Sequence, residues 1–168
     1  MASGLFFDPL KLLRVAPLLT STSTLVFAWD ENWYLSLLVG SKHQDEVNKM
    51  LPSYFTRFFE TGIFILAGLN TLTVSTTIGN LMNDRPVLNH LKSSRWYWAG
   101  LAFTLFHFAF VPTIAYPIRD IMEDRSKGNS TKDLQKWLDI HRIRTLVADL
   151  PAFVSFVGAA LSAFSLAV

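Results

Sequence analysis

The stretch that decides the fold reads Trp-Leu-Asp-Ile-His-Arg-Ile-Arg-Thr-Leu-Val-Ala-Asp, from Trp137 to Asp149. At helical spacing Trp137, His141 and Arg144 fall on one stripe, and Asp149 lies on the neighbouring stripe. Residues 150–168 follow directly, nineteen residues without a charge. A run of this length and composition is typical of a membrane-spanning helix. The sequence therefore predicts a membrane span that carries an imidazole, guanidinium groups and a carboxylate at one end.

The composition of the whole chain also indicates a membrane protein. Of its 168 residues, 51% are hydrophobic and 17% are charged. The mean hydropathy of +0.31 is too high for an ordinary soluble domain of this size. The net charge is +2, with Lys and Arg scattered among Asp and Glu, so there is no signal of nucleic-acid binding. The absence of Cys excludes disulfides and thiolate sites.

Three further apolar runs precede this helix, at residues 15–29, 61–79 and 96–118. The first has the basic start of a secretory signal, but its centre is rich in Ser and Thr and three spans follow it, which argues against that interpretation. We place the four spans at approximately 12–29, 57–79, 96–118 and 144–166. The expected fold is all-α: one domain, 1–168, forming an antiparallel four-helix transmembrane bundle with the N- and C-termini on the same side.

Antiparallel alternation predicts which polar side chains meet. The end of the first span, the start of the second, the end of the third and the start of the fourth lie on one membrane face. Most of the acids, bases and interfacial aromatic residues belong to that face, which the positive-inside rule assigns to the cytoplasm. A charged side chain inside a span is costly unless it is paired or faces a wet cavity. The gathering on one face therefore marks a candidate site.

The ionisable side chains of this face are the candidate catalytic residues: Asp30, Glu31, Arg57, Glu60, His141, Arg144 and Asp149. The candidate substrate-binding residues are Tyr54, Phe59, His107, Tyr116, Arg119 and Trp137. His141, Thr145 and Asp149 are spaced four residues apart, so one helix edge presents a base, a hydroxyl and an acid. Glu60 would act with them as acid or base, and Arg57 or Arg144 would hold an oxyanion.

A structural interpretation of the same residues stands beside the catalytic one. Charged side chains near helix ends snorkel to water and stabilise the helix ends. Arg57 and Glu60 have the i, i+3 spacing of a salt bridge within one helix. A lone His on an apolar helix, such as His107, is more often a hydrogen-bonded packing residue than a ligand.

The sequence lacks the patterns of common cofactor sites. The four His residues show no paired spacing, and neither a Gly-rich phosphate-binding loop nor a nucleophile elbow is present. We therefore expect no metal and no cofactor. The expected partners are a lipophilic small-molecule substrate, the lipid bilayer and pathway enzymes at the same membrane, but no nucleic acid. The expected location is the endoplasmic reticulum, as a multi-pass protein.

Two motifs resemble those of a known family. They are Val-Pro-Thr-Ile-Ala-Tyr-Pro-Ile-Arg-Asp, from Val111 to Asp120, and Trp137-x-x-x-His141-x-x-Arg144. Both resemble motifs of the fungal anthrone oxygenase-like family, small four-span membrane proteins of secondary-metabolite pathways. The resemblance implies the four-span fold and oxidation of anthrones or related polyketides without an obvious cofactor. The chain departs from the family at two Asn positions, where Arg119 and His141 stand, and a titratable base at 141 suits proton transfer.

Three functions follow from these observations. The first is a membrane-embedded secondary-metabolite tailoring enzyme that uses acid/base catalysis on a lipophilic polyketide-like substrate, by epoxide hydrolysis or by ring-forming cyclisation. The second is a cofactor-independent anthrone-type oxygenase, as the resemblance implies. The third is a non-enzymatic membrane subunit or scaffold whose polar cluster contacts a partner. The source of the product's oxygen atom, water or dioxygen, distinguishes the first from the second.

Overall fold

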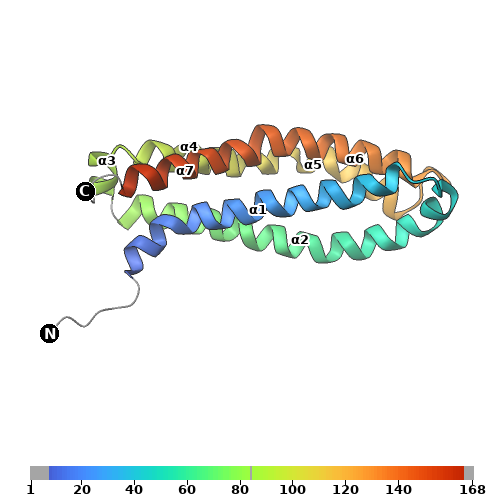
Figure 1. The fold of residues 1–168 in the computed structure, drawn as a ribbon, viewed down its shortest axis with the longest axis horizontal. Coiled ribbons are helices and arrows are strands. Elements are labelled where there is room, and N and C mark those ends of the chain that lie inside the picture. Colours follow the sequence, from blue (N-terminus) through green and yellow to red (C-terminus); the bar gives the residue numbers. More distant parts are fainter. Residues whose placement is uncertain (1–7, 84, 165–168) are drawn as a thin grey trace.

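The computed structural model describes residues 8–83 and 85–164, and this part of the chain is helical with short connections. The elements in order are α1 (Pro9–Val39), α2 (Gln44–Asn83), α3 (Arg85–His90), α4 (Ser94–His107), η1 (Phe108–Phe110), α5 (Val111–Met122), α6 (Ser130–Arg144), η2 (Thr145–Asp149) and α7 (Leu150–Phe164). Four long rods result, namely α1, α2, α4–η1–α5 and α6–η2–α7 (Figure 1). The predicted all-α, four-helix bundle is confirmed.

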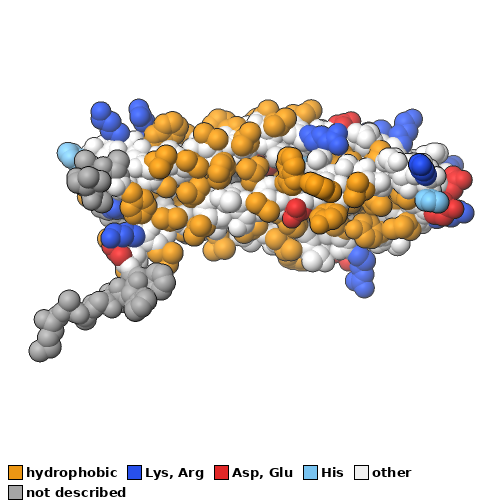
Figure 2. Space-filling model, viewed as in Figure 1, with side chains coloured by type: hydrophobic (Ala, Val, Ile, Leu, Met, Phe, Trp, Pro, Cys, Tyr) orange, Lys and Arg blue, Asp and Glu red, His pale blue; other side chains and the backbone are white. Residues whose placement is uncertain are grey.

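Each rod is long and apolar enough to cross a membrane. The 40 residues of α2 extend ~60 Å, about twice the hydrocarbon thickness of a bilayer. Residues 61–82 of α2 carry no charge and cover ~33 Å, which matches that thickness. Hydrophobic side chains cover the middle of the face seen in Figure 2, and most Lys and Arg lie toward its two ends. We call the zone at the level of residues 61–82 of α2 the apolar belt.

The connections place the two ends of the bundle as the alternation of helices requires. In Figure 1, α1 begins and α7 ends at the same end of the bundle, and the α1–α2 and α5–α6 connections lie together at the other end. The prediction for the two termini themselves concerns residues 1–7 and 165–168, which lie outside the described residues, as does the last part of the span expected at 144–166.

Two apolar cores lie on either side of a polar middle. One core, near the α1–α2 connection, includes Leu51, Phe55 and Leu134. The other, near α3, includes Phe156. A Cβ on Gly100 would lie 2.5 Å from the Phe156 ring, so only glycine lets α4 approach α7 this closely. The two cores hold the rods together and leave the space between them to polar side chains.

Two of the rods are irregular just before a proline. Pro112 follows the 3-10 turn η1, and Pro151 follows the π turn η2. Proline lacks an N–H, and its ring clashes with the carbonyl four residues earlier; in both rods that carbonyl belongs to the irregular turn. The π turn brings Asp149 within 3.4 Å of Arg144, five residues earlier. In an ideal α-helix Asp149 would lie about 140° around the axis from Arg144, so the π turn replaces the expected row of base, hydroxyl and acid by a contact between Arg144 and Asp149.

Polar side chains also join α1 to α2 inside the apolar belt. Pro17 leaves the carbonyl of Leu13 without its helical partner, and Asn80 Nδ2 donates a hydrogen bond to that carbonyl at 2.7 Å. Closer to the middle of the bundle, Thr73 Oγ1 donates to Thr20 Oγ1 at 2.7 Å. These bonds satisfy polar groups that lipid cannot satisfy, and they fix α2 along α1.

Candidate active site

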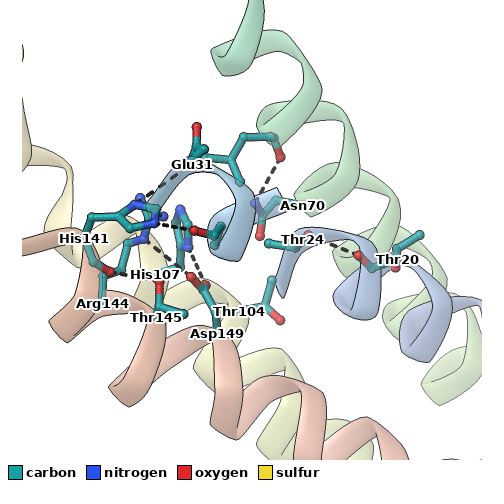
Figure 3. A network of polar contacts seen from close by, with 12 residues as sticks. Thr20, Thr24, Glu31, Asn70, Thr104, His107, His141, Arg144, Thr145 and Asp149 are labelled. Carbon is teal, nitrogen blue, oxygen red and sulfur yellow. Dashed lines mark hydrogen bonds and ion pairs between the residues drawn. The ribbon is translucent and has the colours of Figure 1, made fainter. Parts of the chain in front are cut away.

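Five ionisable side chains are buried together between the two apolar cores (Figure 3). They are Glu31 on α1, His107 at the end of α4, His141 and Arg144 on α6, and Asp149 at the end of the π turn. None is more than 8% exposed. Burial of ionisable groups in this number is costly unless they neutralise one another. The cluster is therefore a candidate for function rather than for stability alone.

Asp149 links a histidine to an arginine. Its Oδ1 lies 2.6 Å from Nδ1 of His107, and its Oδ2 lies 3.4 Å from Nε of Arg144. The contact with Arg144 is an ion pair without a hydrogen bond, because both atoms lack a hydrogen-bond partner in the described part of the chain. With Nδ1 of His107 held by the carboxylate, Nε2 is the ring nitrogen that remains for a substrate.

The hydrogen bonds of His141 define its protonation. Nε2 lies 2.8 Å from the carbonyl oxygen of Ala28, which can only accept, so Nε2 carries the proton. Arg144 Nη2 lies 3.0 Å from Nδ1, and a guanidinium can only donate, so Nδ1 is the acceptor. The ring also stacks on Trp137, with centroids 4.7 Å apart. His141 is thus a neutral ring that orients Arg144, and neither of its nitrogens is free to take a proton from a substrate.

The charges of the cluster leave room for one mobile proton. Arg144 contributes one positive charge, ionised Glu31 and Asp149 contribute two negative charges, and His141 is neutral by its hydrogen bonds. A net negative charge in an apolar interior is costly. One further proton, on His107 or on one of the two carboxyl groups, makes the cluster neutral. A single proton held among these three side chains therefore suffices to neutralise the cluster.

A cavity of about 680 Å³ lies beside the cluster, between α2 and the α4–η1–α5 rod. Three of the five ionisable residues line it: Glu31, His107 and Arg144. Its other walls are mainly aliphatic and aromatic, with Phe59 and Ile63 on α2 among them. Cavities of this volume hold drug-sized ligands. An apolar molecule in the cavity would therefore lie against an imidazole, a guanidinium and a carboxylate.

A second, much smaller cavity lies behind Asp149. It measures about 10 Å³ and is lined by hydroxyl and amide side chains together with Asp149. The polar residues are Ser21, Thr24, Asn70, Thr73 and Thr104. A polar space of this size accommodates roughly one water molecule. Asn70 lines both cavities.

The structure brings together most, but not all, of the residues selected from the sequence. Glu31, His107, His141, Arg144 and Asp149 form the cluster, and Phe59, Arg119 and Trp137 line the large cavity. The others lie on the surface: Asp30, Tyr54, Arg57, Glu60 and Tyr116. Arg57 and Glu60 pair with each other at 3.8 Å, with side chains 88% and 57% exposed. This is the salt bridge within one helix that their i, i+3 spacing indicated. Among the described residues, no group of three or more His, Asp or Glu is arranged to hold a metal ion.

Sequence reasoning missed several polar residues of the site. Asn70 and Thr104 are buried beside Asp149, and Gly62 lines the large cavity, where its Cα faces Glu31. The signal for Asn70 was present, since an amide in an uncharged span must be satisfied by protein. Ser and Thr are common in packed membrane helices, so Thr104 carried no distinguishing signal.

Comparison with known proteins gives the family. Over 155 residues the chain is 35% identical to the epoxidase pydX of Acremonium sp, covering 92% of this chain and 96% of that protein. It is 34% identical to the epoxidase gkaX of Penicillium citrinum, over 92% of this chain and 96% of that protein. It is 31% identical to a protein of Mollisia scopiformis named "Probable epoxidase scpX", over 92% and 97% respectively.

No family model and no solved structure matches the chain. The three relatives are named epoxidases and not anthrone oxygenases, so the likeness to the latter family stays a resemblance of motifs. At 31% to 35% identity over 92% of its length, the chain belongs to the family of fungal proteins that includes these epoxidases.

Proposed function

We propose that the protein is a membrane-embedded tailoring enzyme of secondary metabolism that epoxidises an alkene of a lipophilic, polyketide-like substrate. One observation carries the proposal: His107, held by Asp149 at 2.6 Å, lines a large apolar cavity. The names of the relatives support epoxidation as the reaction. The apolar walls suit a polyene or other alkene better than a polar substrate.

The proposed reaction joins one oxygen atom of dioxygen to the alkene. The alkene, dioxygen, two electrons and two protons give the epoxide and water, with the electrons supplied by a reduced flavin that diffuses in from solution. His107 delivers a proton from Nε2 to the oxygen atom that leaves as water, and Asp149 stabilises the imidazolium before transfer. Arg144, held in place by His141, stabilises the negative charge that develops on oxygen. Glu31 lies on the same cavity wall and relays the second proton, which the cluster takes up from solvent after the first has been transferred.

The same side chains support a second candidate, the opening of an epoxide. Glu31 and His107 both line the cavity, so one can protonate the epoxide oxygen while the other activates water or an internal hydroxyl. Attack by water is hydrolysis, and attack by an internal hydroxyl is cyclisation. A non-enzymatic scaffold is the third candidate, and it assigns no chemical role to the cluster.

Isotope labelling of the product tests these candidates. Membranes that contain the protein are incubated with a panel of lipophilic alkenes and epoxides and with a reductant, under labelled dioxygen in ordinary water and in the converse experiment. Epoxidation predicts a product that carries one oxygen from dioxygen. Label from water would mean hydrolysis, an isomer without label would mean cyclisation, and no product with any alkene or epoxide would favour the scaffold.

Variants then assign the activity to the cluster. His107→Asn removes the proton carrier, and we expect turnover to fall by about 10²–10⁴-fold. His90→Asn is the matched control, since His90 is exposed on α3 far from the cavity. Full activity of His107→Asn would refute the assignment of His107 as the acid/base group.

The location that we propose is the endoplasmic reticulum membrane, with four spans. The chain contains no Cys, so single-Cys variants report cleanly on topology. Lys42→Cys, between α1 and α2, and His90→Cys, at the end of α3, should be labelled from opposite sides of sealed microsomes. Labelling of both from one side would refute the four-span topology.

A further inference from the structure

The large cavity is an elongated slot. Its lining on α2 runs from Thr56 to Asn70, and on the opposite rod from His107 to Glu123. At 1.5 Å per residue, these rows extend ~21 Å and ~24 Å. A ligand that fills the slot is therefore long and narrow, with one end near His107 and the other near Arg119.

The slot opens sideways through the apolar belt. Its α2 wall includes Ile63 and Leu66, and its opposite wall includes Val111 and Ile114. Ile63 and Val111 are exposed on the outside of the bundle, so the rim of the slot lies between α2 and α5. No charged residue of α2 lies between 61 and 82. An apolar molecule dissolved in lipid could enter here without crossing a charged surface.

The outer end of the slot carries a cation that no acid neutralises. Arg119 is exposed and lies over the Tyr116 ring, 5.6 Å from its centroid. Two acids follow it closely in the sequence, and one of them, Glu123, lines the same end of the slot. Arg125 pairs with both acids, with Glu123 at 2.6 Å and with Asp120 at 3.9 Å. Among the described residues no carboxylate lies within 4.0 Å of Arg119. Its charge is therefore available to a ligand.

The lining also contains a hydrogen-bond donor that has no acceptor. The indole Nε1 of Trp137 is buried and has no hydrogen-bond partner among the described residues, and Trp137 lines the slot. A buried N–H without a partner is costly, so an oxygen atom of a ligand would satisfy it. The slot thus combines apolar walls, a fixed cation at one end and an unpaired N–H donor.

We infer that the ligand of this slot is an acidic amphiphile: a long apolar chain with a carboxylate or an equally acidic enol that binds Arg119. The chain extends along α2 and α5, so the reacting carbon near His107 lies ~18 Å from the acidic group. This inference rests on the proposed function in naming the ligand a substrate, but binding of the acid does not depend on epoxidation.

An anionic lipid headgroup could supply the same negative charge to Arg119. The two sources differ in shape, because a phospholipid carries two chains and a bulky phosphate ester, whereas the slot has room for one chain. We commit to a single-chain acid. A phospholipid would bind at the surface of the bundle and would leave the slot free.

Fluorescence of parinaric acid, a conjugated polyene fatty acid, provides the test. The acid and its methyl ester are titrated into the full-length protein in an uncharged detergent. We expect the acid to bind more tightly than the ester. Arg119→Gln should weaken binding of the acid by about tenfold and leave the ester unchanged, because one charge-assisted contact is lost. Arg119→Lys should retain most of the affinity, and Arg142→Gln, an exposed cation of α6 outside the lining, should behave as wild type.

Competition separates the two sources of negative charge. Oleic acid should displace the probe, and phosphatidylglycerol should not. Equal displacement by phosphatidylglycerol, equal affinity of wild type for acid and ester, or unchanged binding by Arg119→Gln would each overturn the inference. Since no turnover is measured, a failure of epoxidation and a failure of acid recognition are distinguishable.

Discussion

The ion pair between Arg144 and Asp149 predicts a strong coupling between two buried residues. Both side chains are about 95% buried, at 6% and 4% exposure, and their charged atoms approach to 3.4 Å. Asp149→Asn keeps the volume of the side chain and its ability to accept from His107, but it removes the charge next to Arg144. Arg144→Gln removes the only cation of the cluster other than a protonated His107.

The magnitude follows from the distance. At 3.4 Å and an effective dielectric constant of about 20, the attraction is about 5 kcal/mol before desolvation is counted. Removing one partner of a buried pair typically costs about 3–5 kcal/mol of unfolding free energy. We expect about 3 kcal/mol for Asp149→Asn, because Glu31 remains as a second anion. For a chain of this size that loss lowers the Tm by roughly 6–12 °C.

A double-mutant cycle in detergent, followed by Trp fluorescence during thermal and denaturant unfolding, measures the coupling. The double variant should lose about 2 kcal/mol less than the sum of the single variants. Glu31→Gln is the matched control: it removes the excess negative charge of the cluster and should leave the Tm unchanged or slightly higher. Additive losses within about 0.5 kcal/mol would refute the pairing, and a large loss in Glu31→Gln would refute the charge count.

Three further predictions test the packing and the cavity. Gly100→Ala should lower the free energy of unfolding by about 1–3 kcal/mol, because the added Cβ has no room against α7. Gly68→Ala, where the added Cβ has no atom within 4 Å, should raise the free energy of unfolding by about 0.5–1 kcal/mol. Thermal melts of both variants measure these changes. Ala67→Trp, in the lining, should lower kcat/KM by narrowing the slot, and Gly68→Trp, one residue outside the lining, should not. Asn80→Ala leaves a partly buried carbonyl of α1 unsatisfied and should cost about 1–3 kcal/mol. Asn83→Ala, which removes an exposed bond within its own helix, should be nearly neutral in the same melts.

The fold was predictable because helices long and apolar enough to cross a membrane are visible in the sequence as long uncharged runs. Each uncharged run contains more residues than the uncharged stretches found in loops of soluble proteins. Charged residues and proline mark the turns between the runs. The lengths of the rods were less predictable. α2 begins at Gln44, well before the apolar belt, because Leu51 and Phe55 pack into a core that lies outside the belt. Hydropathy identifies the long apolar part of a helix, but it does not identify the part that continues beyond it and packs against other helices.

The position of the site along the bundle axis was predictable, but the face that each helix turns toward the site was not. Topology placed residues of α2 beside the cluster, yet it did not say which face of α2 turns inward. Phe55 and Gly62 are buried, and Arg57 and Glu60 each lie two residues from one of them, about 200° around the helix. Both therefore point outward and pair with each other. In this segment the spacing of the buried residues, rather than the position of the charges, indicates which face of α2 turns inward.

His107 shows the opposite limit of sequence reasoning. Its depth in the third span was apparent from the sequence, but its partner Asp149 is 42 residues away. No local pattern predicts that contact, because it depends on the π turn that precedes Pro151. From the sequence, a single His in an apolar helix therefore favoured a packing role. The tertiary structure places a carboxylate beside it.

The two irregular turns explain why His107 and Asp149 meet at this level of the bundle. η1 begins directly after His107, and η2 ends at Asp149, so each member of the His–Asp pair borders a place where the helical hydrogen bonding is disturbed. Proline within a span is costly in a packed helix, and buried charges are costly as well. Other prolines of the chain, such as Pro17, lie within regular helix, so proline alone does not produce the wide turn. The π turn persists because it brings Asp149 within reach of both His107 and Arg144. The irregular turn and the neutralisation of the buried charges thus depend on each other: without the π turn, Asp149 would not reach both partners.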